Sequence, residues 1–157
     1  MKIQKATLKD LSKIWEIYLN GIMAEVSYQY PKVPKEEILR RLKLRKKEKV
    51  KEFKESINSK YGNMLVVLEN EKIIAFGDAK IDKLFKDEGK VQKVYVKKDS
   101  RKKGIGKKLV QELIRWLEQN KVKRIHAELY VKNIPSTKLY ERFGFKTTLI
   151  KVERIKK

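Results

Sequence analysis

One short segment constrains the fold of this chain more than any other. Arg101-Lys102-Lys103-Gly104-Ile105-Gly106 follows a predicted strand over 90–97 and precedes a helix whose apolar residues recur at helical spacing. Two glycines at the mouth of a helix let main-chain amides approach an anion closely, and the helix dipole adds positive charge at the same point. The segment therefore predicts an α/β fold with a phosphate or diphosphate site at a strand-to-helix turn.

Two well-known nucleotide-binding motifs do not fit this segment. A dinucleotide-binding fingerprint needs a third glycine, which Gly106-Lys107-Lys108-Leu109 does not supply, and no P-loop pattern occurs in the chain. We therefore do not expect dinucleotide redox chemistry or nucleotide hydrolysis. An ordinary glycine-containing turn with no ligand remains the alternative at this point.

The rest of the chain alternates between helical and strand patterns without a repeat or a linker. A Pro34-initiated helix is interrupted on its apolar side at Arg45 and Lys46, where it can kink, and Glu69-Asn70-Glu71 is a polar hairpin turn. We expect one domain over residues 1–157, an α/β fold with a mixed, mostly antiparallel central sheet flanked by helices on both faces. The predicted strands are 2–7, 63–68, 72–81, 90–97, 124–131 and one or two within 146–155; the predicted helices are 11–26, 35–57, 105–117 and 134–143.

Charge and cysteine content narrow the possible chemistry. The chain has 41 Lys and Arg against 20 Asp and Glu, with a net charge of +21, and the excess gathers in 32–60 and 97–124. Such segments attract any polyanion, although a solvated Lys- and Glu-rich surface of a heat-adapted protein has the same composition. The absence of Cys and the single His126 argue against a thiolate metal site and a Cys nucleophile, so we expect no metal. With no long apolar run, we expect a cytoplasmic protein that does not engage a membrane.

Three segments together resemble the GNAT superfamily of acyl-CoA-dependent N-acyltransferases. The loop 101–106 matches the family's Q/R-x-x-G-x-G/A pattern; Ala127-Glu128-Leu129-Tyr130-Val131-Lys132-Asn133 is similar to its L-x-V-x-x-x-N strand end; and 139–145, Leu-Tyr-Glu-Arg-Phe-Gly-Phe, matches L-Y-x-x-x-G-F. The resemblance extends from about residue 91 to 145, and the first 90 residues agree in element order. The proline that often follows the family's cofactor strand is absent, since Lys97-Lys98-Asp99-Ser100 stands there.

The resemblance implies acetyl-CoA as co-substrate and assigns its binding residues. The strand before the loop would pair its main chain with the pantetheine arm, the loop amides and lysines would hold the diphosphate, and Asn133 would touch the cofactor while it also caps the next helix. The implied cofactor-binding residues are Val94, Tyr95, Val96, Arg101, Lys102, Lys103, Gly104, Ile105, Gly106, Lys107, Asn133 and Tyr140.

The same resemblance implies direct acetyl transfer to an amine, with no protein nucleophile. Tyr140 would be the acid that protonates the leaving sulfur, and a packing role is its alternative. Glu128 stands where a catalytic glutamate lies in the ribosomal-protein alanine acetyltransferase branch, although a strand carboxylate paired with lysine is equally compatible. His126 shares its strand face and is a weaker candidate.

We therefore expect an N-acetyltransferase that transfers an acetyl group from acetyl-CoA to a primary amine of a protein or peptide, at an N-terminus or a lysine. The positive surface motivates that preference because it repels free polycations at long range. The alternative acceptor is a small amine of polyamine or antibiotic type, held by acids such as Glu128, Asp78 and Asp82. A non-catalytic nucleic-acid or ribosome-binding module is possible but not favoured, since no aromatic stacking pattern accompanies the charge. A monomer and a homodimer both remain open.

Overall fold

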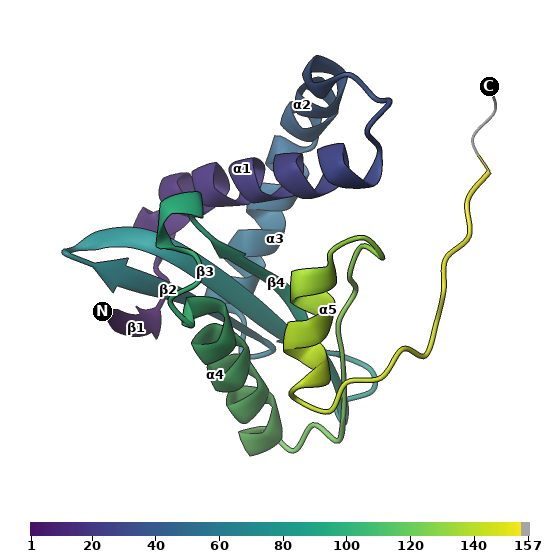
Figure 1. The fold of residues 1–157 in the computed structure, drawn as a ribbon. Coiled ribbons are helices and arrows are strands. Elements are labelled where there is room, and N and C mark those ends of the chain that lie inside the picture. The colour runs from purple at the N-terminus through teal and green to yellow at the C-terminus, as the bar shows by residue number, and fades with distance from the viewer. Residues whose placement is uncertain (155–157) are drawn as a thin grey trace.

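The computed structural model describes residues 1–154, which form one twisted sheet covered by helices on both faces (Figure 1). The strands lie in the order β1-β2-β3-β4-β5; β1 to β4 pair antiparallel, and β5 pairs parallel to β4. In chain order the elements are β1 (Lys2–Lys5), a 3₁₀ turn (Leu8–Asp10), α1 (Leu11–Gln29), α2 (Lys35–Leu44), α3 (Lys46–Asn58), β2 (Gly62–Glu69), β3 (Lys72–Ile81), β4 (Glu88–Val96), a second 3₁₀ turn (Lys98–Ser100), α4 (Ile105–Gln119), β5 (Arg124–His126) and α5 (Ile134–Glu141).

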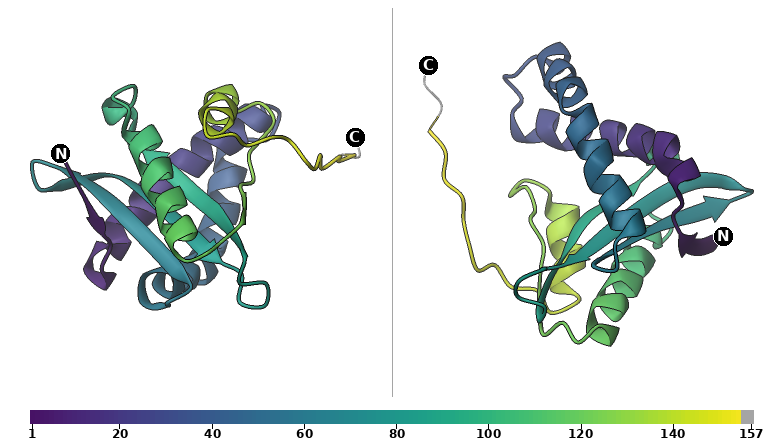
Figure 2. Two further views of the ribbon diagram at one scale, coloured as in Figure 1. Left: turned by 90° about the horizontal axis from the view of Figure 1, so that it is seen from below. Right: turned by 180° about the vertical axis from the view of Figure 1, so that it is seen from behind.

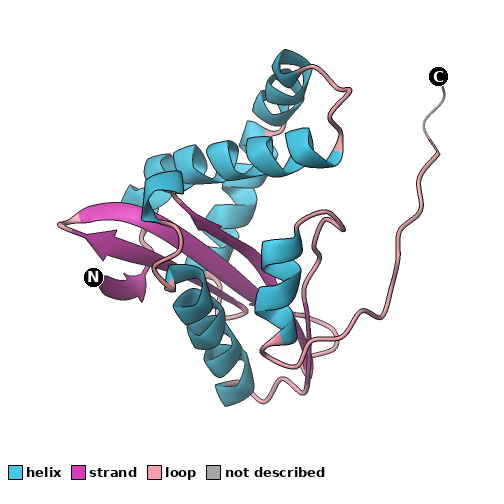
Figure 3. Ribbon diagram, in the orientation of Figure 1, coloured by secondary structure: helices cyan, strands magenta, loops and turns pink. Residues whose placement is uncertain are grey.

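Two separate hydrophobic clusters lie on the two faces of the sheet. Helix α4 presents a fully buried stripe that includes Leu109, Leu113 and Leu117, and α5 adds Tyr140 on the same face. On the opposite face α1 and α3 bury Ile14, Phe53 and their neighbours against the sheet. Figure 3 shows this helix–sheet–helix arrangement, which confirms the predicted fold class.

Local sequence signals explain several element boundaries. The hairpin between β2 and β3 closes with Glu69 opposite Lys72, so that Asn70 and Glu71 form a two-residue loop with φ of 49° and 62°. Left-handed geometry at both positions matches the twist of the flanking strands. The predicted long basic helix breaks at Arg45, which ends α2 and precedes α3 with φ −86° and ψ 2°. The polar interruption of its apolar side therefore marks a real break.

The predicted strand over 124–131 is wrong in its length. Only Arg124–His126 pairs with β4, opposite Glu88–Lys90, and the chain then diverges from β4. β-branched and aromatic residues favour strand geometry, but a strand also needs a partner, and β4 and β5 separate after Lys90. This divergence opens one edge of β4 from Val91 to Val96.

The predicted strands over 146–155 are also absent from the described part of that segment. Residues 146–154 form no strand and extend away from the sheet in both views of Figure 2, while position 155 lies outside the described residues. The segment touches the body through Glu153, whose carboxylate accepts a hydrogen bond from the Tyr30 hydroxyl at 2.6 Å. The residues of this segment favour strand geometry, but no neighbouring strand pairs with residues 146–154 in this structure. None of the helices within residues 1–154 combines the length and the apolarity that a membrane crossing requires.

Candidate functional site

The loop before α4 has the backbone geometry of an anion site. Lys102 and Gly104 both adopt left-handed conformations, with φ of 63° and 74°. Gly104 is the N-cap of α4 and no side chain caps that end of the helix. Within residues 1–154 none of the amides from Lys102 to Lys107 donates a hydrogen bond, because the first ladder bond of the helix begins at Lys108. A run of free amides at a helix N-terminus attracts negative charge.

The glycines of this loop leave room that the protein does not use. A Cβ added at Gly104 would meet no heavy atom within 4 Å, and one at Gly106 would meet only Leu139 at 3.8 Å and Val96 at 4.0 Å. Neither glycine is therefore required by close packing within the chain. Absence of a side chain at both positions instead keeps the approach to the amides open, which is the requirement of a bound diphosphate.

The side chains around the loop include exposed lysines, an arginine held by a hydrogen bond, and one buried isoleucine. Lys102 and Lys107 are exposed, and the Lys103 ammonium lies 3.6 Å from Glu69. The Arg101 guanidinium donates to the Val96 carbonyl at 3.0 Å, which holds it against the end of β4. The Ile105 side chain is buried, so only its main chain can face a ligand. The loop thus offers main-chain amides and exposed lysines to an anion.

The strand β4 offers a free edge beside this loop. β3 pairs with one edge of β4 as far as Ala75 opposite Val96, and β5 leaves the other edge at Lys90. Val94 and Val96 pack toward the α4 side, whereas Tyr95 packs toward α1. The main chain of Val94, Tyr95 and Val96 is therefore available to an extended ligand in the opening between β4 and β5.

Glu25 of α1 closes the far side of that opening, and the sequence alone does not single it out. Its carboxylate accepts from the Tyr95 hydroxyl at 2.8 Å and from the Asn133 side-chain amide at 2.6 Å. Gly21 lies one turn earlier on the same face, where an added Cβ would come within 2.1 Å of the Tyr95 ring. The missing side chain at Gly21 therefore allows Tyr95 to reach Glu25.

The pKa values of Glu25 and of the tyrosines around it are shifted from their ordinary values. Burial raises the pKa of Glu25, although its hydrogen bonds to Tyr95 and Asn133 and the charge of Arg101 oppose that rise. Burial, with the charge of Glu25 and the hydrogen bond to it, also raises the pKa of Tyr95, so the phenol remains a donor. Tyr18, edge-on to Tyr95 at 5.7 Å between ring centroids, has its pKa raised to about 12, mainly by burial.

Asn133 links the two sides of the opening. Its side-chain oxygen accepts from the Ser136 amide at 3.3 Å and caps α5, while its nitrogen donates to Glu25. One side chain therefore both caps α5 and contacts Glu25, while its predicted contact with the cofactor stays a prediction. Tyr130 lies three residues before Asn133, and its pKa is raised by burial and then by the charge of Glu25.

The two residues implied as catalytic lie in different surroundings. Tyr140 is buried on α5 with its ring edge-on to Phe145, at 5.1 Å between centroids, and burial raises its pKa, so its hydroxyl is protonated. Glu128 is exposed in the chain between β5 and α5, and His126 is exposed on β5. The structure therefore brings Tyr95 and Asn133 together around Glu25 and leaves Glu128 at the surface.

The acids considered for a small cation pocket have other partners. Asp78 is fully buried and accepts from the Ser56 hydroxyl at 3.1 Å, and burial raises its pKa. Asp82 accepts from the amides of Leu84 and Phe85, both at 2.8 Å, within its own turn. In residues 1–154 no group of three or more His, Asp or Glu side chains is arranged to hold a metal ion.

Comparisons with known proteins define the class. The sequence model of the Acetyltransferase (GNAT) family matches residues 29–145, more than half of the chain, so the chain belongs to that family. The resemblance to this family described above is therefore confirmed.

Individual relatives cover less of the chain. The spermine/spermidine N(1)-acetyltransferase of Bacillus subtilis is 48% identical over 44 residues, which is 27% of this chain and 29% of that protein. A "Probable spermine N(1)-acetyltransferase" of Bacillus subtilis subspecies natto is 39% identical over 56 residues, which is 35% of this chain and 37% of the relative. The matched segments thus span about a third of these relatives.

Solved structures share the fold across nearly the whole chain. A PaiA N-acetyltransferase from Thermoplasma acidophilum, in complex with coenzyme A, has a TM-score of 0.73 at 21% identity and covers 94% of this chain and 90% of its own. An aminoglycoside antibiotic 6'-N-acetyltransferase from Acinetobacter haemolyticus has a TM-score of 0.70 at 18% identity, covering 100% and 99%. At these identities the likeness shows the fold alone.

The residues present fit acetyl-CoA. Free amides, two glycines with unused space and exposed lysines suit a diphosphate, and the open edge of β4 suits the amide-bearing arm. These two features adjoin at Arg101, which contacts both the strand end and the loop.

Proposed function

We propose that this protein is an acetyl-CoA-dependent N-acetyltransferase and that its acceptor is a small polycationic amine of the polyamine kind. The observation that carries the proposal is the Glu25 carboxylate, which lies among tyrosines at the end of the β4–β5 opening. A half-buried carboxylate binds an ammonium more strongly than an exposed one because less water competes, and aromatic faces add about 0.5–2 kcal/mol of cation–π attraction. The two polyamine acetyltransferases among the relatives support the same acceptor class.

A protein or peptide acceptor, the expectation from surface charge, is the weaker reading. That expectation considered only long-range repulsion by the net charge of +21. At about 0.1 M ionic strength, charges farther apart than about 10 Å are largely screened. The Glu25 carboxylate would attract an acceptor ammonium at contact distance. Salt therefore screens this attraction less than it screens the long-range repulsion.

In the proposed reaction the bound coenzyme supplies an acetyl group activated as a thioester. Glu25 orients the acceptor ammonium and takes its proton, which frees the nitrogen lone pair for attack on the carbonyl carbon. The new C–N bond forms as the C–S bond breaks, and the Tyr140 hydroxyl donates a proton to the leaving sulfur. Main-chain amides of β4, from Val94 to Val96, would face the carbonyl oxygen as negative charge develops on it.

The roles of the loop residues follow from its geometry. The amides from Lys102 to Lys107 would hold the diphosphate, with Lys102, Lys103 and Lys107 adding charge, while Arg101 fixes the strand end. Asn133 positions Glu25 through its side-chain nitrogen, and the second N–H of that nitrogen would contact the coenzyme arm.

Steady-state kinetics with paired acceptors tests this proposal. With acetyl-CoA saturating and free thiol as the readout, we expect kcat/KM for spermine to exceed that for an alanine-initiated peptide by about a hundredfold or more. Glu25→Gln should raise KM for spermine at least about tenfold. Glu16→Gln is the matched control because Glu16 lies on the same helix and pairs at the surface with Lys13.

The proposal has two clear points of failure. A preference for the peptide over spermine would overturn the acceptor class. Equal kinetics for Glu25→Gln and Glu16→Gln would remove Glu25 from acceptor binding, whichever amine is preferred.

A further inference from the structure

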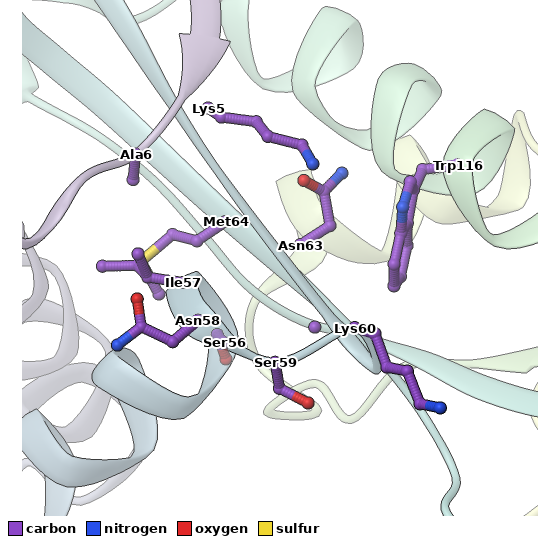
Figure 4. Close-up of a pocket in the computed structure, with 11 residues that line it drawn as sticks. Lys5, Ala6, Ser56, Ile57, Asn58, Ser59, Lys60, Asn63, Met64 and Trp116 are labelled. Carbon is purple, nitrogen blue, oxygen red and sulfur yellow. The ribbon is translucent and has the colours of Figure 1, made fainter.

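A cavity lies away from the proposed acetyl-transfer site, toward the end of α4 opposite the glycine loop. It has a volume of about 340 Å³ and is bounded by the end of β1, the start of β2, the C-terminal end of α3 and Trp116 of α4 (Figure 4). Trp116 is eleven residues after Ile105, so it lies about 17 Å along the helix from the glycine loop. The two regions are therefore physically separate.

The cavity exists because the sheet edge ends early there. The main chain of Ala6 makes the last bond to β2, through its amide to the Met64 carbonyl at 2.8 Å, and the chain then turns away into α1. β2 begins two residues before Met64, at Gly62, and no β1 residue faces that part. α3 covers the gap from one face of the sheet and Trp116 borders it from the other.

Asn63 carries an unmet hydrogen-bonding requirement into this cavity. The residue is only 5% exposed, and its side-chain oxygen has no partner within the described residues. Buried polar atoms are almost always paired, so an orphaned acceptor beside a cavity points to a ligand that donates a hydrogen bond. Figure 4 shows the amide directed between Lys5 and the Trp116 ring.

The remaining lining groups specify an anionic and planar partner. Lys5 and Lys60 are the charged residues that line the cavity, and no acidic side chain lines it. The half-buried Trp116 ring offers a flat stacking surface, and Met64 and Ile57 add apolar surface. The Lys60 ammonium lies over the Tyr61 ring, 5.2 Å from its centroid, so Lys5 is the cation directed toward Asn63. A carboxamide, a stacking ring and this cation together suit a nucleobase that bears a phosphate.

We propose that this cavity binds a purine nucleoside monophosphate of the adenine type. The Asn63 amide complements the adenine edge, because its oxygen accepts from the exocyclic amino group while its nitrogen donates to a ring nitrogen. The base stacks on Trp116, and Lys5 faces the phosphate. The site would thus sense a free nucleotide at a distance from the acetyl-transfer centre.

Calorimetry with AMP, in the presence of saturating acetyl-CoA, tests the proposal. Saturation occupies the first site, so AMP binding that persists belongs elsewhere. We expect Asn63→Leu to weaken AMP about tenfold or more, and GMP to bind wild-type protein about tenfold more weakly than AMP. Lys5→Gln should reduce the salt dependence of binding, whereas Lys54→Gln, at an exposed position of α3 outside the cavity, should not.

Tryptophan fluorescence measures AMP binding independently, and it remains usable if Asn63→Leu does not fold. The chain has two tryptophans, so Trp15→Phe leaves Trp116 as the reporter, and stacking by AMP should quench it. No quenching and no heat up to about 10 mM AMP would overturn the proposal. Loss of AMP binding under saturating acetyl-CoA, or an unchanged affinity in Asn63→Leu, would do the same.

A short oligoadenylate distinguishes a site for free AMP from a site for adenosines within single-stranded RNA. A free-nucleotide site should bind AMP at least as tightly as each adenosine of a six-nucleotide RNA. Much tighter binding of the RNA, lost in Asn63→Leu, would replace the mononucleotide assignment by a single-stranded RNA site. Because both titrations are read by binding, failure here leaves the proposed acetyl-transfer function unaffected.

Discussion

Gly104→Ala isolates what the glycine loop does. Gly104 has φ of 74°, and an added Cβ would touch no protein atom within 4 Å, so the substitution creates no steric clash in the free protein. Its cost to stability is the left-handed strain of an alanine, about 1–2 kcal/mol. The Cβ would nevertheless lie beside the free amides and obstruct a diphosphate oxygen.

The expected loss of coenzyme affinity follows from the hydrogen bonds removed. A bond from an amide to a charged oxygen contributes about 1.5–3 kcal/mol, so losing one weakens coenzyme A binding by about tenfold to a hundredfold. Gly144→Ala is a matched control because Gly144 has φ of 81° and the same empty surroundings, but follows α5 rather than preceding α4. Both variants should melt a few degrees lower, as calorimetry can measure.

Titration calorimetry with coenzyme A then gives the decisive comparison. We expect weakened binding in Gly104→Ala and wild-type binding in Gly144→Ala. Equal affinities in the two variants would refute the assignment of the loop amides to the diphosphate.

Three further outcomes follow from the same site. Because burial raises the pKa of Glu25 and only the ionised carboxylate accepts a proton, kcat/KM for spermine should rise with pH through that raised pKa, and Glu25→Gln should lack this acidic limb; identical pH profiles would contradict the role. Tyr140→Phe should lower kcat about tenfold or more while leaving coenzyme affinity within about twofold, whereas full turnover would limit Tyr140 to packing. Raising salt should weaken coenzyme binding but should not lower kcat/KM for spermine, since screening removes the repulsion of a +21 chain; a steep fall with salt would contradict the local-attraction argument.

Local sequence signals predicted the parts of the fold that depend on neighbouring residues. The glycine pair at the start of α4, the two-residue hairpin turn and the break at Arg45 each follow from conformational preferences within a few positions. Asn133 as a helix cap belongs to the same class. The two-sided α/β arrangement followed from the order of these elements.

Features that depend on distant pairing were not predictable in the same way. The strand expected to reach Val131 ends at His126, and the segment 146–154 forms no strand, because pairing depends on where neighbouring strands diverge. Glu25 is one of many polar residues on an amphipathic helix until Tyr95 and Asn133 are brought to it. Gly21 within that helix was the one sequence signal of close packing.

Backbone amide NMR during a coenzyme A titration tests the central assignment most directly. Since each amide reports separately, the account predicts the largest shifts at Lys102 to Lys107 and along Val94 to Val96. Large shifts confined to other regions, such as Asn63 and Trp116, with the loop amides unmoved, would contradict it.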